Sequence, residues 1–162
     1  MTTRWSRLLA LAMLGLGGAQ CAQAQVVISQ VYGGGGNSGA TYTNDFIELH
    51  NTGTAAVDLS GYSVQYASAT GSSWAVTALS GSLPAGGYYL VQEAKGSGGT
   101  TALPTPDASG GIAMSGTAGK VALVASATAL SGACPSGAVD LVGFGSTASC
   151  YEGSGPTPAP SN

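Results

Sequence analysis

Positive charge is scarce in this 162-residue chain, which carries four lysines and arginines against seven aspartates and glutamates. Arg4 and Arg7 lie near the start, so a mature chain beginning at Gln25 keeps only Lys95 and Lys120 and has a net charge of 2 − 7 = −5. Binding to nucleic acid draws its affinity from basic side chains that neutralise phosphates. The composition therefore argues against direct binding to DNA or to an anionic membrane.

Histidine is rarer still, because His50 is the only one. A Ser–His–acid triad would have to use it, and no motif marks a partner serine. A structural zinc site takes about four His or Cys ligands, more than the chain offers after its first two dozen residues. The patterns H-E-x-x-H, C-x-x-C and the EF-hand loop are absent. The sequence predicts no catalytic residues, no cofactor and no metal site beyond a weak cation candidate at Asp45 and Glu48.

A long hydrophobic run is also missing, since the apolar residues 8–19 are too few to cross a bilayer. They follow a positive head and precede "AQA", the small-x-small pattern of a secretory signal, which ends at Ala24. We expect cleavage between Ala24 and Gln25, and a protein that is secreted to the medium or the periplasm. Cys21 raises the alternative of a lipoprotein, but Gln20 precedes it where such signals carry a small residue.

Cysteine is limited to three residues, and cleavage after Ala24 leaves Cys134 and Cys150. In an exported protein an even pair indicates a disulfide. Such a bridge constrains the unfolded chain and would stabilise the fold by about 3 kcal/mol. Two free thiols are the alternative.

What the chain does have is short runs of period-two alternation, rich in β-branched and aromatic residues and separated by Gly, Ser, Asn and Thr. No 3.6-residue apolar period interrupts them. The expected strands cover residues 26–32, 46–51, 56–59, 62–67, 74–79, 88–93, 120–125 and 139–144. Seven or eight strands predict one all-β sandwich over residues 25–150. We expect a long loop at 95–111 and a Pro-rich linker or C-terminal tail at 151–162, from which a longer parent protein could continue.

Gly34, Gly36 and Gly39 spell G-x-G-x-x-G directly after the first expected strand. In a dinucleotide fold this motif works because a helix follows and its N-terminus faces the pyrophosphate. Here another strand follows, and no lysine supplies a phosphate contact. We interpret the run as a glycine-rich surface loop.

Glu48 and His50 alternate with Ile47 and Leu49, so the acid and the histidine share one face of a strand. Asp45 lies at the strand end on the opposite face. Glu48 could form a weak oxygen-ligand cation site with Asp45 and nearby asparagines. We favour a structural interpretation, in which Glu48 accepts hydrogen bonds from a neighbouring loop and fixes the register of the strand.

Three segments together resemble the lamin-tail domain family: "DFIELHNTGTAAVDLSGYSV" at 45–64, "LSGSLPAGGYYLV" at 79–91 and "MSGTAGKVALV" at 114–124. They match its E-L-x-N strand, its V-D-L-S-G turn, its Leu-Pro-x-Gly approach and its Gly-marked final hairpin. The resemblance covers residues 26–124, with 139–144 as a closing strand. It implies an immunoglobulin-like β-sandwich in which Glu48 belongs to the strand signature.

Bacterial domains of this family are often the first module of secreted nucleases, so the resemblance implies a non-catalytic accessory or positioning module. Its partner would be a downstream catalytic domain or another protein. The metal-binding acid, Asp/Asn pairs and two histidines of such nucleases are not in this chain. Nuclear lamin tails engage DNA, which the charge of −5 opposes here.

Two alternatives remain open. The first is a surface-adhesion or glycan-binding module, in which Tyr66, Trp74, Tyr88 and Tyr89 would stack on sugar rings. The second is an enzyme in its own right, which the missing catalytic residues oppose.

Overall fold

The computed structural model describes residues 25–160, and within this range the secondary structure consists of ten strands. No helix there is long and apolar enough to cross a membrane. The expected leader, with its cleavage point after Ala24, and Cys21 lie outside the described residues. The strands are β1 Val26–Tyr32, β2 Asn44–Asn51, β3 Val57–Asp58, β4 Ser63–Ser68, β5 Ala75–Ala78, β6 Ser82–Leu83, β7 Tyr88–Lys95, β8 Ala108–Ser109, β9 Gly119–Val124 and β10 Asp140–Phe144.

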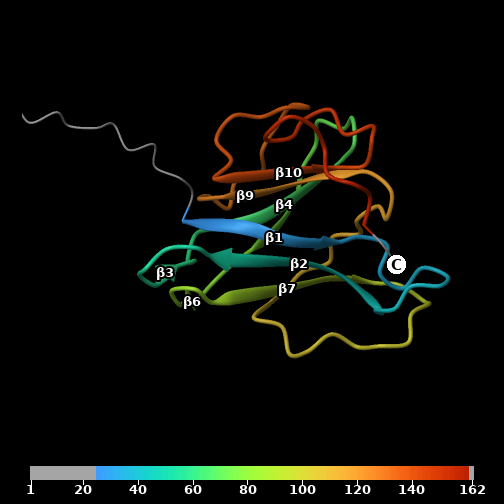
Figure 1. Ribbon diagram of the computed structural model, residues 1–162, viewed down its shortest axis with the longest axis horizontal. Coiled ribbons are helices and arrows are strands. Elements are labelled where there is room, and N and C mark those ends of the chain that lie inside the picture. The colour runs from blue at the N-terminus through green and yellow to red at the C-terminus, as the bar shows by residue number, and fades with distance from the viewer. Residues whose placement is uncertain (1–24, 161–162) are drawn as a thin grey trace, which may run out of the picture.

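Two four-stranded sheets form the body of the domain, as Figure 1 shows, with the strand orders β1-β2-β7-β8 and β10-β9-β4-β5. The pair β3-β6 lies at one end of the sandwich. Every pairing is antiparallel except β7 with β8, which run parallel. The architecture confirms the expected all-β, immunoglobulin-like sandwich.

The core lies between the two sheets and follows from the period-two pattern, because alternate residues of a strand point to the same face. Its fully buried side chains include Ile47, Leu49, Val64, Val91, Val121 and Leu123. Burying a side chain of this size stabilises a fold by about 1.5–3 kcal/mol. A second, smaller cluster on β9, with Ala122 and Val124, packs against Trp74 and Leu141. Strand β9 is therefore buried on both faces.

All eight expected strands are present, with ends that differ by one or two residues. The structure adds β6 and β8, each only two residues long. The stretch 95–111, expected as a loop throughout, thus returns to pair with β7. Two bonds hold it there: Leu90 N donates to the Asp107 carboxylate over 2.8 Å, and Gly110 N donates to Gln92 O over 2.8 Å.

The glycine-rich run after β1 differs from the surface loop that its composition predicts. Gly33–Gly36 are buried, and only residues 37–39 are exposed. A Cβ atom on Gly35 would lie 2.0 Å from the backbone carbon of Asn44, and Gly36 has a φ of 71°. The glycines here permit close packing of backbone on backbone, which no larger residue allows.

The segment that we expect to be a Pro-rich linker or C-terminal tail contacts the sandwich within its described residues, 151–160. Thr157 forms an isolated parallel bridge with Phe144 at the end of β10. Thr157 N donates to Gly143 O over 2.8 Å, and Gly145 N donates to Thr157 O over 2.9 Å. The segment therefore covers part of the outer edge of β10.

Candidate functional site

The outer face of the β1-β2-β7 sheet carries Glu48, as the strand pattern predicts. Glu48 lies opposite Gln30 on β1 and Leu90 on β7. Next to it, β1 contains an irregularity between Ile28 and Gln30. This change of register accommodates Ser29, whose hydroxyl donates to Glu48 Oε1 over 2.7 Å. The partner of Glu48 is thus a neighbouring strand, where we expected a loop.

A shallow groove of about 180 Å³ lies on the same face, with Glu48 in its lining beside Tyr42 and Leu103. At its floor the Tyr42 ring meets Phe46 edge-on, with the ring centroids 5.7 Å apart. Phe46 in turn stacks on Tyr32 at 5.2 Å. The three rings therefore form one aromatic cluster beside Glu48.

His50 is stacked on Tyr88, its cross-strand partner, at a centroid distance of 4.4 Å and an interplanar angle of 10°. Tyr88 is 60 % exposed, so one face of the ring pair is open to solvent. Their side chains meet because residues opposite each other in an antiparallel pair lie on the same face. The stack is a small exposed aromatic surface at the ends of β2 and β7.

Asp45 lies deep in the fold, away from this face. Its Oδ1 accepts from Gly35 N over 2.6 Å, and its Oδ2 accepts from Met114 N over 2.6 Å. Burial raises the pKa of Asp45, while the backbone donors Met114, Gly35 and Gly34 act to lower it. Asp45 thus has the role that we predicted for Glu48, namely fixing a loop. The two acids of the cation candidate are held by different partners.

Glu93 on β7 is a second buried carboxylate, which the sequence interpretation missed. Its Oε2 accepts from Ile112 N over 2.9 Å. Burial raises the pKa of Glu93, the Thr77 side chain and Ile112 N–H lower it, and the charge of Asp45 raises it further. Glu93 lies four residues after the buried Tyr89 on β7, so both side chains point to the same face of the strand. This alternation was the available signal that Glu93 is buried. Together Asp45 and Glu93 hold the segment 112–114 that leads into β9.

Hydrogen bonds inside the fold occupy six of the seven carboxylates. Besides Asp45, Glu48 and Glu93, three more accept backbone N–H bonds: Asp58 from Ser60, Asp107 from Leu90 and Asp140 from Ile28. The seventh, Glu152, lies beside Asp140, and partial burial followed by that charge raises its pKa. Within residues 25–160 no group of three or more His, Cys, Asp and Glu side chains is arranged to hold a metal ion. The acids therefore serve the backbone of the domain.

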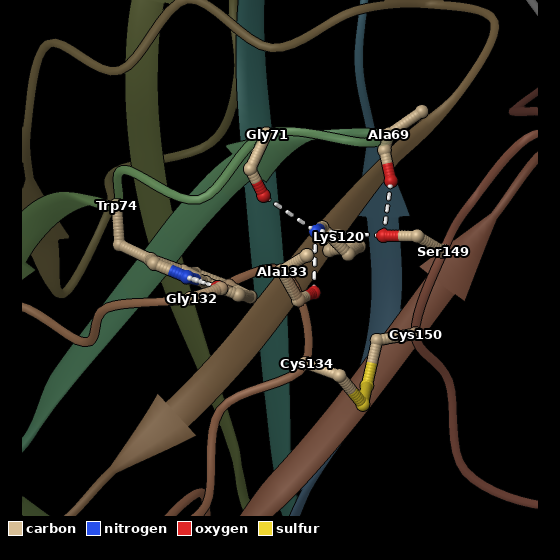
Figure 2. Close-up of a disulfide and its surroundings, with 9 residues drawn as sticks. All are labelled: Ala69, Gly71, Trp74, Lys120, Gly132, Ala133, Cys134, Ser149 and Cys150. Carbon is tan, nitrogen blue, oxygen red and sulfur yellow. Dashed lines mark hydrogen bonds between the residues drawn. A yellow bond between two sulfur atoms is a disulfide. The ribbon is translucent and has the colours of Figure 1, made fainter.

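Lys120 on β9 is the most unusual side chain, since it is fully buried without an acidic partner in its hydrogen bonds. Figure 2 shows its ammonium nitrogen at the centre of three acceptors: Gly71 O at 2.8 Å, Ala133 O at 2.6 Å and Ser149 Oγ at 3.1 Å. The nitrogen also lies 5.5 Å from the centre of the Trp74 ring. Burial lowers the pKa of Lys120.

A disulfide joins Cys134 to Cys150 beside this lysine, as Figure 2 shows, with the Cα atoms 5.1 Å apart. Ala133 and Ser149, two of the three acceptors, directly precede the cysteines in the chain. The bridge therefore ties together the two loop segments that supply these acceptors to the ammonium group. No sequence pattern identified Lys120, because it begins a run of otherwise apolar strand residues.

The four aromatic side chains considered for sugar stacking do not form one platform. Trp74 and Tyr89 are buried at 6 % and 4 % exposure, and Trp74 Nε1 donates to Gly132 O over 3.0 Å. Tyr66 is half-buried, and its hydroxyl accepts from Ser115 N over 3.1 Å. Of the four, Tyr88 alone presents a broad ring surface.

Comparison with known proteins agrees with this architecture. The profile of the Lamin Tail Domain family matches residues 19–144, which include all ten strands and end with the last residue of β10. No curated protein matches the chain. Because the family match covers well over half of the sequence, it establishes membership. The chain belongs to the lamin tail domain family and is an immunoglobulin-like module of that family.

Proposed function

We propose that the chain is a secreted, non-catalytic module that acts as an accessory binding or positioning domain of a larger extracellular protein, with a nuclease as the first candidate. The observation that carries this proposal is the use of its acids: six of seven carboxylates accept hydrogen bonds within the fold. A general acid or base must be within reach of a substrate proton. The sole histidine, His50, stacks on Tyr88.

Export is supported by the Cys134–Cys150 bridge, since disulfides persist in oxidising compartments. The expected signal of residues 1–24 supports it independently. Intact-mass measurement of exported protein tests both: we expect a chain that begins at Gln25 and lacks two hydrogens at the cysteines. A lipidated N-terminus at Cys21 would contradict the secretion proposal.

An activity assay tests the non-catalytic proposal. The purified protein is incubated with plasmid DNA and Mg²⁺, Mn²⁺, Ca²⁺ or Zn²⁺, and binding to duplex DNA is titrated at several salt concentrations. We expect no hydrolysis, and a dissociation constant no tighter than about 1 µM, the upper end of non-specific binding at physiological salt. Hydrolysis that disappears in His50→Ala would show an enzyme. Tighter, salt-sensitive binding would show a DNA-targeting module.

Glycan binding is the second candidate, and the exposed Tyr88 ring beside His50 is the observation that favours it. An aromatic face of this kind can stack on the apolar face of a sugar. NMR titration with oligosaccharides would then shift the Tyr88 ring signals, and Tyr88→Ala would abolish the shifts. Tyr151, which is 40 % exposed and lies elsewhere, provides a matched control through Tyr151→Ala.

A further inference from the structure

Strand β1 is an edge strand of one sheet and β10 is an edge strand of the other. These two edge strands contact each other. Ile28 N on β1 donates to Asp140 Oδ2 on β10 over 2.6 Å, which links the two edges directly. An edge strand presents unpaired N–H and C=O groups that another extended chain can pair with. The outer edge of β10 is therefore a place where a further strand can add.

The chain's own tail already makes such a pairing, through a single residue between two prolines. Thr157 both donates to Gly143 O and accepts from Gly145 N, at 2.8 and 2.9 Å. Pro156 and Pro158 have no N–H to offer, so the only donor in this triplet meets the outward carbonyl of Gly143. Proline also holds the chain extended, which reduces the entropy lost on docking.

A groove of about 280 Å³ accompanies the bridge. Its lining comes from three segments: Ile28–Val31 of β1, Val142 and Phe144 of β10, and the tail residues Thr157, Pro158 and Pro160. The groove is thus continuous with the surface on which the tail is seated. Its residues are mainly apolar and suit proline rings and small side chains.

We propose that the β10 edge is a strand-addition site for an extended peptide that places one donor residue between two prolines and carries no acids. The chain's own 156–160 segment occupies the site in cis, and a proline-rich segment of a partner takes the same place by displacing it. Acidic residues are excluded because Asp140 and Glu152 lie beside the site. This inference rests on the proposed positioning role, for which it supplies the surface. Main-chain hydrogen bonds combined with proline packing are an established route to peptide recognition.

The test uses the full chain carrying Thr157→Pro, which removes the donor to Gly143 from the resident tail. A synthetic peptide of residues 155–160, Gly-Pro-Thr-Pro-Ala-Pro, is added to the ¹⁵N-labelled protein, and the Gly145 amide is followed by NMR. A short tether supplies an effective concentration of about 1 mM, so a tail that is docked in cis implies a dissociation constant of about 1 mM or tighter in trans. We expect a saturable 1:1 shift toward the wild-type position.

Two matched peptides sharpen the result. Replacing the threonine of the peptide by alanine keeps the backbone donor and should preserve binding, whereas replacing it by proline should abolish it. Wild-type protein should bind the peptide at least about twofold more weakly, since its own tail competes at an effective concentration equal to or above the dissociation constant. If Thr157→Pro does not fold, the double variant Pro158→Gly, Pro160→Gly loosens the tail without removing the Thr157 donor and takes its place.

The proposal is overturned if no saturable shift appears at several millimolar peptide, or if the alanine and proline peptides behave alike. The proposal would also be overturned if the Thr157→Pro variant forms dimers that the peptide does not dissociate, because the β10 edge would then serve self-association. The DNA hydrolysis assay is independent of these outcomes, so failure here leaves the non-catalytic proposal standing on its own evidence.

Discussion

The ammonium nitrogen of Lys120 lies 2.6 Å from the carbonyl oxygen of Ala133, the residue directly before Cys134. Its bond to Ser149 Oγ repeats the arrangement, because Ser149 directly precedes Cys150. A buried charge is costly unless hydrogen bonds compensate it. Here three oxygen acceptors and the face of Trp74 do so. The disulfide keeps two of those acceptors in place, so the bridge and the lysine stabilise one another.

Lys120→Ala should lower the free energy of unfolding by about 3 kcal/mol. The change leaves a cavity beside Trp74 and removes the donor from the carbonyls of Gly71 and Ala133. Urea unfolding measures the loss. Lys95→Ala is the matched control at the exposed end of β7, where substitutions usually stay within about 0.5 kcal/mol. Equal effects of the two changes would contradict the role of Lys120.

The pair Cys134→Ser, Cys150→Ser should cost about 2–5 kcal/mol. Combined with Lys120→Met, the total loss should be smaller than the sum of the separate losses by about 1 kcal/mol, because each change disturbs the same acceptors. A double-mutant cycle from urea unfolding gives this coupling energy. Strict additivity would mean that the bridge and the lysine act independently.

Asp45→Asn should destabilise the domain by about 2 kcal/mol, since the amide keeps one acceptor oxygen and turns its NH₂ group toward a backbone N–H of Gly35 or Met114. Glu48→Gln is the control on the same strand. Its carboxylate is only partly buried and accepts from the hydroxyl of the exposed Ser29, so we expect a loss below about 1 kcal/mol. A larger effect at Glu48 would reverse this assignment.

Calcium should leave the melting temperature of the wild type unchanged. Ligands that bind the folded state raise it by mass action, and the two acids proposed as a cation site contact different partners. Differential scanning calorimetry with millimolar CaCl₂ and with EDTA provides the comparison. A rise with calcium that disappears in Glu48→Gln would establish the cation site after all.

Stability should fall as pH rises from about 4.5 to about 7.5. Burial raises the pKa of Asp45 and Glu93 in the folded state, so folding favours their protonated forms. Their contribution is complete below the ordinary values of 3.8 and 4.5 and is lost as pH rises through the raised folded values. Urea unfolding at both pH values measures the difference.

Repulsion among the negative charges of an acidic protein also lowers stability as pH rises. Substitutions separate this repulsion from the effect of the buried carboxyl groups. Glu93→Gln should flatten the pH dependence, because it removes one buried titrating group. Asp58→Asn removes a charge of the same sign from an exposed turn, where the Ser60 backbone N–H lowers the pKa of Asp58. The Asp58→Asn change should leave the fall of stability with pH unchanged or make it slightly steeper. Equal flattening by both would assign the slope to net charge.

Strand periodicity predicted the sandwich because eight strands bury alternate residues, and that pattern depends only on residues that are close together in the sequence. Strands β6 and β8 have two residues each and show no alternation. The position of β8 depends on Asp107 and Gly110 reaching backbone groups of β7, which only the tertiary fold brings near. Sequence reasoning therefore found the elements that carry their own hydrophobic pattern and missed those held by distant hydrogen bonds.

The candidate sites show the same division. The alternation of side chains along a strand correctly placed Asp45 and Glu48 on opposite faces, but Met114, the partner of Asp45, is 69 residues away in the sequence. The acceptors of Lys120 come from three separate segments, so no spacing in the sequence connects them. Alternating prolines predicted an extended tail. They carry no information about the strand edge on which Thr157 docks.

The bond from Ile28 to Asp140 spans 112 residues, and it joins the first strand to the last. Such long-range closure makes folding slow, because most of the chain must be ordered before the contact can form. Because the chain is synthesised from its N-terminus, β1 is made first, and one edge of it stays uncovered until β10 has also been made. The sandwich can therefore close only after β10 has been synthesised.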